Sequence, residues 1–124
     1  MKSLNYLLVV FLLTSACQKE TKEDEPVLPS DYGSGMYIVT EGGISFYDGV
    51  VVKNQIYNKV NGNSILNGNK IKFRGTKAYI VTDSQILTTN IQTFESKGAI
   101  SGFTNAVDFD FVSNDRLFVV DKGD

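Results

Sequence analysis

One five-residue phrase occurs three times along the chain at a nearly constant interval. It reads MYIVT at residues 36–40, AYIVT at 78–82 and LFVVD at 117–121. The aromatic residue in its second position moves from Tyr37 to Tyr79 to Phe118, in steps of 42 and 39 residues. A repeat of about 40 residues, built on β-branched and aromatic side chains, is typical of the four-stranded blade of a β-propeller rather than of a helical repeat. The spacing therefore predicts an all-β chain made of repeated small sheets.

Short runs with strand-like composition follow one another from residue 36 onward. They leave no room for an amphipathic helix of useful length. Breaks rich in Asn and Gly separate them, because tight turns need residues that tolerate a positive φ. Residues 69–100 alone account for one complete four-stranded unit; a first unit begins at Met36, and a third begins at Ala106 and stops after its second strand. The predicted strands are 36–40, 44–48, 50–57, 69–74, 77–82, 85–90, 94–100, 106–112 and 116–121.

The number of repeats sets the expected fold class. Residues 36–124 hold about two and a third four-stranded blades, whereas a propeller ring typically has at least four. We therefore expect an all-β, partial β-propeller, either a fragment of a ring of about six to eight blades or half of an assembly. Residues 18–124 alone would then be marginally stable and prone to associate through an apolar edge formed by Leu117, Phe118 and Val119. A monodisperse, cooperatively melting monomer would instead indicate a small barrel or sandwich.

The first 17 residues have the order of a secretory signal. Lys2 supplies the positive start, and the apolar run at 4–13 is too short to span a bilayer, which takes about 20 residues. The run ends in LTSAC at 13–17, which resembles the lipobox of bacterial lipoproteins, with Thr14 where that motif more often has Leu. The resemblance implies removal of residues 1–16 as a signal peptide and lipid attachment at Cys17. The alternatives are an ordinary signal peptide with a chance cysteine, or a buried N-terminal helix.

Residues 18–30 contain both prolines of the chain and many charged side chains, but few aliphatic ones. A segment of this composition buries too little apolar surface to offset the entropy lost on ordering. We therefore predict a flexible acidic tether over residues 17–35, followed by the folded part at 36–124. The start of the tether, CQKE at 17–20, resembles the short acidic export signal of Bacteroidetes surface lipoproteins. The expected location is the cell outer membrane, lipid-anchored and surface-exposed, with a plain charged linker on the periplasmic side as the alternative.

The composition excludes several kinds of chemistry from these residues. There is no His and no Trp, and Cys17 is the only Cys. Catalytic triads that use His, proton transfer by His near neutral pH and the usual Cys/His zinc sites are therefore ruled out. The net charge is −2, and the Lys and Arg residues are scattered instead of forming the basic stripe that binds nucleic acid. We predict no catalytic, cofactor-binding or metal-binding residue here, no cofactor and no nucleic-acid partner.

Four local features could still carry chemistry, although each has a simpler structural interpretation. Asp108 and Asp110 could bind a cation, but the solvent face of a sheet edge explains them better. Residues 121–124 (DKGD) resemble both the start of a calcium loop and an adhesion tripeptide, yet a strand-ending turn is favoured. Residues 33–35 (GSG) lack the βαβ context of a phosphate loop and are interpreted as a hinge. Aromatic residues could stack on a ligand, but core positions are favoured for most of them: Tyr32, Tyr37, Phe46, Tyr47 and Tyr57.

The second repeat carries the most specific resemblance to a known family. Its YIVT at 79–82, followed by QI at 85–86 and IQTF at 91–94, resembles the YVTN-type repeat of surface-layer propellers. Asn90 stands where that repeat usually has Asp before its third turn, which leaves open a different side-chain hydrogen bond there. The opening at 37–48 is similar to the first blade of Bacteroidetes lipoprotein propellers. The resemblance implies a binding platform beside an outer-membrane transporter, with corrinoids as ligands in one branch, but it transfers no ligand-contacting residue.

Two function classes follow, together with a third possibility. The leading one is a non-enzymatic ligand-capture or protein-interaction platform, held at the membrane by its lipid anchor, whose partners would be an outer-membrane transporter and an unknown small molecule. The alternative is a propeller enzyme, such as a lyase or a sugar- or quinone-dependent oxidoreductase, with its active site in blades outside this sequence. The third is a truncated gene product without a function of its own. Histidines clustered on successive downstream blade loops would favour the enzyme.

Overall fold

Antiparallel strands make up almost all of the regular secondary structure in the residues that the computed structural model describes, 32–123. The predicted signal peptide, Cys17 and the tether as far as residue 31 lie outside the described residues. The elements in chain order are β1 (Met36–Thr40), β2 (Gly43–Tyr47), β3 (Val52–Lys53), α1 (Ile56–Asn61), β4 (Gly68–Arg74), β5 (Lys77–Thr82), β6 (Gln85–Asn90), β7 (Ser96–Ser101), β8 (Ala106–Phe111) and β9 (Leu117–Asp121).

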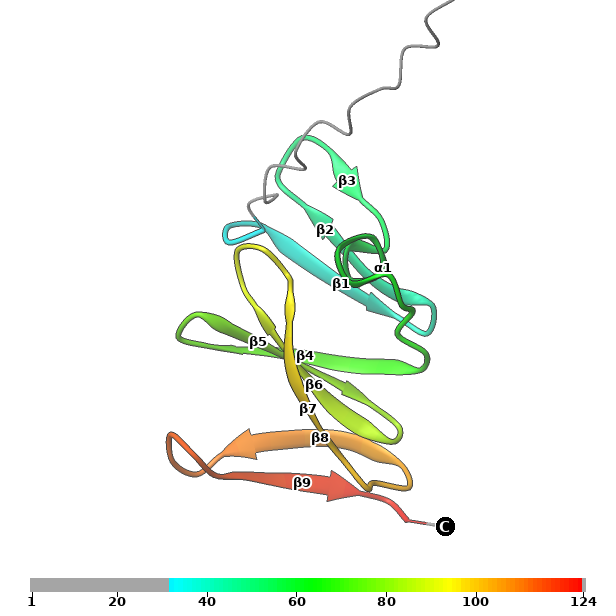
Figure 1. The fold of residues 1–124 in the computed structure, drawn as a ribbon, viewed down its shortest axis with the longest axis vertical. Coiled ribbons are helices and arrows are strands. Elements are labelled where there is room, and N and C mark those ends of the chain that lie inside the picture. The colour runs from blue at the N-terminus through cyan, green and yellow to red at the C-terminus, as the bar shows by residue number, and fades with distance from the viewer. Residues whose placement is uncertain (1–31, 124) are drawn as a thin grey trace, which may run out of the picture.

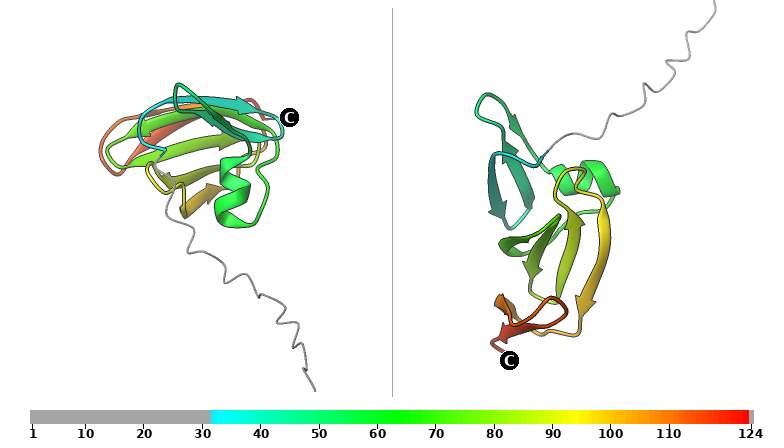
Figure 2. Two further views of the ribbon diagram at one scale, coloured as in Figure 1. Left: turned by 90° about the horizontal axis from the view of Figure 1, so that it is seen from above. Right: turned by 90° about the vertical axis from the view of Figure 1, so that its left-hand side faces the viewer.

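The strands form three separate sheets, and the chain completes each sheet before it begins the next. The strand orders are β1-β2-β3, β4-β5-β6-β7 and β8-β9, and every pair of neighbours is antiparallel. The sheets follow one another along the long axis of the molecule in chain order (Figure 1). Seen from above, they lie over one another, and α1 projects to one side (Figure 2). The all-β prediction is confirmed, and the middle sheet is the complete four-stranded unit expected over residues 69–100.

The strand predicted at 50–57 is wrong beyond Lys53. Gln55 has a φ of 52°, in the left-handed region, and an extended strand cannot continue through that conformation. The next residues form α1 instead, which buries the adjacent Ile56 and Tyr57 and packs Val60 beside them. Residues at i and i+4 share one face of a helix, so this apolar set suits a short helix better than the alternation of a strand. The prediction of no useful helix therefore missed this one turn and a half of helix.

The larger core lies between the first and second sheets. Phe46 from β2 and Phe94, just before β7, are fully buried there, and the ring of Tyr32 meets them edge-on at 5.4 Å and 5.7 Å between centroids. The backbone N–H of Tyr32 donates to the carbonyl of Gln92 at 3.0 Å, so packing begins at Tyr32 within the described residues. Such edge-to-face pairs add about 0.5–1.5 kcal/mol each beyond the burial of their area.

The smaller core lies between the second and third sheets. Val81, Ile86, Ala106 and Phe109 are buried in it, with 1% or less of each exposed. The partly buried ring of Tyr79 packs against it. Each sheet thus covers one face of the sheet before it. The middle sheet has a neighbour on each side and is therefore apolar on both faces.

A backbone hydrogen bond joins consecutive sheets at equivalent positions. The carbonyl of Glu41 accepts from the N–H of Asn67 at 2.9 Å, and the carbonyl of Asp83 accepts from the N–H of Ala106 at 2.8 Å. Both acceptors follow the aromatic residue of their own phrase by four positions, and both donors precede the aromatic residue of the next phrase by twelve. The step from sheet one to sheet two is therefore made in the same way as the step from sheet two to sheet three.

An aromatic pair repeats at the same two junctions. Tyr37 of the first phrase lies 4.8 Å from Phe73 of β4, and Tyr79 of the second phrase lies 4.9 Å from Phe111 of β8. Each phenylalanine belongs to the first strand of the following sheet and pairs there with the residue that precedes the aromatic of its own phrase. The repeat seen in the sequence is therefore also a repeat of contacts between sheets.

The side chain of Asn90 closes the turn before β7. The amide oxygen of Asn90 accepts hydrogen bonds from the backbone N–H groups of Gln92 at 2.7 Å and Thr93 at 3.0 Å. This is an Asx-type turn, which needs only a short side chain with an acceptor oxygen. Asn90 supplies such an acceptor itself, as an Asp at this position could.

Candidate functional site

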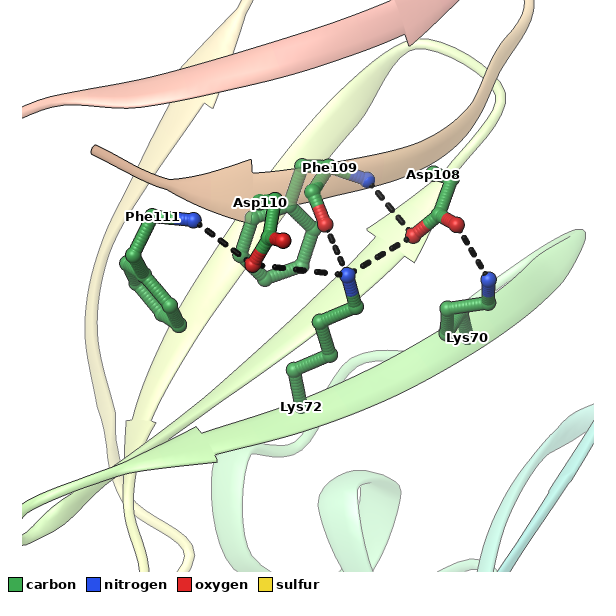
Figure 3. Close-up of polar contacts among 6 residues, drawn as sticks. All are labelled: Lys70, Lys72, Asp108, Phe109, Asp110 and Phe111. Atoms are coloured by element: carbon green, nitrogen blue, oxygen red, sulfur yellow. Dashed lines mark hydrogen bonds and ion pairs between the residues drawn. The ribbon is translucent and has the colours of Figure 1, made fainter.

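The two acidic residues that were considered as cation ligands, Asp108 and Asp110, contact two lysines from the neighbouring sheet. One carboxylate oxygen of Asp108 lies 2.5 Å from the Nζ of Lys70, and the other lies 3.1 Å from the Nζ of Lys72 (Figure 3). Asp110 is farther away, at 3.9 Å from the same Lys72 nitrogen. Lys72 also donates to the backbone carbonyl of Phe109. These contacts join β4 and β8, the first strands of their sheets, and the Asp108 carboxylate is neutralised by two protein cations.

The same contacts determine the acidity of Asp108. Hydrogen bonds from Lys70 and Lys72, and one from the backbone N–H of Phe109, lower the pKa of Asp108 to about 2. Among residues 32–123, no group of three or more His, Cys, Asp or Glu side chains is arranged to hold a metal ion. The acidic pair therefore ties two sheets together, whereas the sheet-edge interpretation had it facing solvent alone.

We expect Asp108→Asn to weaken the loss of stability at acidic pH. A carboxyl group whose pKa is lowered on folding stabilises the native state above its unfolded pKa, near pH 4, and that stabilisation is lost as the pH falls toward about 2. The unfolding temperature of the wild-type chain should therefore drop over this interval more than that of Asp108→Asn. Asp110→Asn is the matched control and should keep the wild-type drop, because it removes only the 3.9 Å ion pair with Lys72 and keeps an oxygen that can accept the 2.9 Å hydrogen bond from the N–H of Phe111. Identical acid profiles for all three proteins would contradict this role.

Arg74 continues the line of cations on β4. Its guanidinium donates to the carbonyl of Ser113 at 2.6 Å and to the side-chain oxygen of Asn114 at 2.9 Å. Its Cζ atom also lies 4.7 Å from the ring centre of Phe111, within the range of a cation–π contact. The basic side chains at positions 70, 72 and 74 thus all bind the β8 hairpin, and this line of positive charge is used for packing between sheets.

Asp121 has its carboxylate oxygens occupied by the backbone. It accepts from the N–H groups of Thr104 at 3.0 Å, Asn105 at 2.7 Å and Gly123 at 3.2 Å, and these hydrogen bonds lower its pKa. The side chain therefore fixes the loop ahead of β8 to the end of β9. This geometry fits the strand-ending interpretation of residues 121–124, of which Asp124 lies outside the described residues.

The aromatic residues considered as stacking platforms are mostly used for packing. Tyr32, Phe46 and Tyr57 are buried, with 4% or less of each exposed. Tyr37 is half-buried among the rings of Phe46, Phe73 and Phe94. The hydroxyl of Tyr47 donates to the carbonyl of Gly49 at 2.7 Å.

Residues 33–35 pass close to the same rings. A Cβ atom on Gly35 would lie 2.5 Å from the ring of Phe46 and 2.5 Å from the carbonyl oxygen of Tyr47. Glycine is therefore required at position 35 by the close approach of the chain to β2. Residues 33–35, interpreted from the sequence as a hinge, are thus positioned at Gly35 by packing against β2.

An apolar groove of about 550 Å³ lies at the far end of the molecule, where β9 passes the end of β7. Sites for small molecules usually have volumes of roughly 300–1,000 Å³ and a mostly apolar lining with a few polar groups. Within the described chain β9 pairs only with β8, so its other edge is unpaired and borders this groove. The lining residues are Ile100, Phe103, Val112, Asp115, Arg116, Leu117, Phe118 and Val119.

The sequence indicated an apolar, unpaired edge at this end of the chain, but it did not indicate the groove. Leu117, Phe118 and Val119 were expected to form one apolar face, but alternate residues of a strand point to opposite faces. Leu117 and Val119 pack against the middle sheet, whereas 73% of Phe118 is exposed. Ile100 and Phe103 were missed because no local pattern shows which sheet edges meet. The sequence indicates these two residues only by placing an apolar side chain on each side of the turn between β7 and β8.

Comparisons with known proteins add no identity to this geometry, because neither the protein-family models nor the curated proteins give a match to the chain. The predicted lipid-attachment residue, Cys17, lies outside the described residues. Within residues 32–123, no helix has the length and apolar character needed to cross a membrane.

Proposed function

We propose that this chain is an outer-membrane lipoprotein, anchored through Cys17, whose sheets are β-propeller blades and serve as a ligand-capture or protein-interaction platform beside a nutrient transporter. The observation that carries the proposal is the repeated junction between sheets. Two consecutive steps use the same backbone hydrogen bond and the same aromatic pair. A radial array of small sheets grows by such a constant step, and each added sheet covers the exposed face of the last one.

A binding role is supported by how the polar side chains are used. Asp108 and Asp121 are held by cations and backbone N–H groups, which suits a rigid scaffold better than proton transfer to a substrate. The groove beside β9 combines apolar side chains with Asp115 and Arg116 and with an unpaired strand edge. Such a surface can take an extended peptide as an added strand, or a small apolar ligand with a polar end.

External protease is expected to degrade the protein in intact cells. The acidic segment after Cys17 supports export to the outer face of the outer membrane, and a tether of about 15 residues would leave the chain accessible there. The measurement is immunoblotting after protease treatment of whole cells, with a periplasmic protein as the control for membrane integrity. If this protein survives while an established surface lipoprotein is cleaved, it lies on the inner side.

A photo-crosslinking residue at Val112, in the groove, should capture an outer-membrane protein in growing cells. The same residue at Val50, which is 86% exposed in the turn after β2, is the matched control because it lies away from the groove. Mass spectrometry of the adducts identifies the captured protein. Equal labelling from both positions, or adducts that contain only this chain, would contradict a platform that works with a transporter.

A further inference from the structure

The first and third positions of the repeated phrase form the face that packs on the preceding sheet. In the middle sheet these residues are Ala78 and Ile80, which are 0% exposed, and in the last sheet they are Leu117 and Val119, which pack against the middle sheet. No sheet precedes the first one within the described residues. Its equivalent residues are therefore uncovered: Met36 is 59% exposed and Ile38 is 40% exposed.

The second and fourth positions form the face that receives the following sheet. In the first sheet Tyr37 and Val39 pack against the core shared with the middle sheet, and in the middle sheet Tyr79 and Val81 pack against the core shared with the last one. In the last sheet the equivalent residues are uncovered. There, 73% of Phe118 and 56% of Val120 are exposed.

Within the described residues, the two halves of a contact that the chain makes twice internally are therefore both left uncovered. We propose that the Phe118/Val120 face of one copy of this chain docks onto the Met36/Ile38 face of a second copy, head to tail. The two internal junctions indicate what each face receives, namely a sheet of the same design. This inference rests on the stacked-sheet architecture proposed above, but not on the lipid anchor or a ligand, and its docking face shares Phe118 with the groove beside β9.

The charges favour this head-to-tail arrangement over contact between two identical ends. Asp110 lies directly opposite Phe118, and Asp108 lies directly opposite Val120. Both aspartates therefore lie on the same face of the sheet as Phe118 and Val120. The Asp110 side chain is 86% exposed. Two such faces brought together would place two exposed Asp110 carboxylates against each other, which is destabilising, whereas Asp108 is already paired with Lys70 and Lys72. The residues opposite Met36 and Ile38 are Tyr47 and Ser45, which are uncharged.

The first sheet also offers apolar surface beyond its phrase. Val52 pairs with Tyr47, which in turn pairs with Met36, so all three lie on the same face. Half of Val52 is exposed, at 50%. A head-to-tail contact uses different surfaces on the two copies, so each copy keeps one unused face. Assembly then continues until the rotation closes a ring.

Disulfide crosslinking in membranes tests the proposal on the full chain, because Cys17 is its only native cysteine. Met36→Cys and Phe118→Cys are made as separate variants with different tags and are produced together. Mild oxidation should give mixed dimers that carry both tags. Phe118→Cys with Val50→Cys is the matched control, since Val50 is exposed but outside both faces. The wild-type chain measures any background from Cys17.

The mixed-dimer yield of the 36/118 pair should exceed that of the 50/118 control and that of Phe118→Cys alone by about tenfold. Adding Val120→Asp to the Phe118→Cys partner should return the yield to the control level, because a further negative charge beside Asp108 and Asp110 would be buried in the contact without a cation of its own. A yield no higher than the control would show that another partner, or another part of the gene product, covers these faces. An equal yield from Phe118→Cys alone would show contact between identical ends, and either result overturns the proposal. Protease sensitivity and capture at Val112 would be unaffected by such a failure.

Discussion

Cys17→Ser is expected to abolish incorporation of labelled palmitate and to move the protein from the membrane fraction to the soluble fraction. Cys17 ends the small-residue junction LTSAC, and it is the only thiol in the chain that could carry a diacylglyceryl group. Each buried acyl CH₂ contributes about 0.8 kcal/mol, and two or more chains are needed for stable anchoring. No helix of residues 32–123 could span the bilayer in place of the lipid. Removal of the thiol should therefore remove most of the attachment.

Thr14→Leu is the matched control for this experiment. It changes the same junction toward the residue that the lipobox more often has and leaves the thiol in place, so labelling and membrane association should be kept or increased. The lipoprotein interpretation would be wrong if the wild-type chain incorporated no palmitate. It would also fail if the serine variant stayed with the membranes after a wash at high salt, which removes electrostatic attachment.

The strands were predictable because their determinants are local. Eight of the nine described strands lie within two residues of the expected bounds. Their signals are the alternation of apolar and polar residues, as at 70–73 and 107–111, and turns rich in Asn and Gly. The exception depends on one residue. Gln55 adopts a left-handed conformation that nothing in its side chain predicts, and the chain then continues as a helix. Lys53, Asn54 and Gln55 separate the apolar residues at 50–52 from those at 56–57, and apolar runs this short are ambiguous between strand and helix.

The candidate site was less predictable because it depends on contacts between sheets. Asp108 and Asp110 share a strand face with the spacing of a ligand pair, but Lys70 and Lys72 reach them from almost 40 positions earlier in the chain. Only the repeat period connects positions that far apart in sequence. The repeat did locate the junctions between sheets. It did not show that basic and acidic first strands would bind each other there.

Phe94→Ala is expected to cause the largest loss of stability among single substitutions in the described chain. The Phe94 ring is fully buried and lies 5.7 Å from Tyr32 and 5.8 Å from Tyr37, at the junction of the first two sheets. Truncation of a buried Phe to Ala typically costs about 3–5 kcal/mol. Small domains have a total stability of about 5 kcal/mol at the low end, so the variant should lose most of its folded population on mild heating.

Phe118→Ala is the matched control, because it removes the same ring from a position that is 73% exposed. Exposed substitutions usually change stability by about 0.5 kcal/mol or less. The unfolding temperature, followed by circular dichroism, should therefore fall by about 12 °C or more for Phe94→Ala and by only a few degrees for Phe118→Ala. Equal shifts for the two variants would mean that the core between the first two sheets does not hold the fold together.

Phe94→Gly separates the contribution of the ring to stability from the cost of the backbone conformation at this position. Phe94 has a φ of 61°, which is unfavourable for a residue with a Cβ by roughly 1–2 kcal/mol and costs glycine almost nothing. The backbone N–H of Phe94 donates to the carbonyl of Asn90 at 2.9 Å, and its carbonyl accepts from the side chain of Asn61 at 3.0 Å. Because both bonds require this conformation and both survive either substitution, Phe94→Gly should unfold at a higher temperature than Phe94→Ala. A lower unfolding temperature for Phe94→Gly than for Phe94→Ala would contradict this. It would mean that the left-handed conformation at position 94 is not strained, and that packing of the ring is not needed to maintain it.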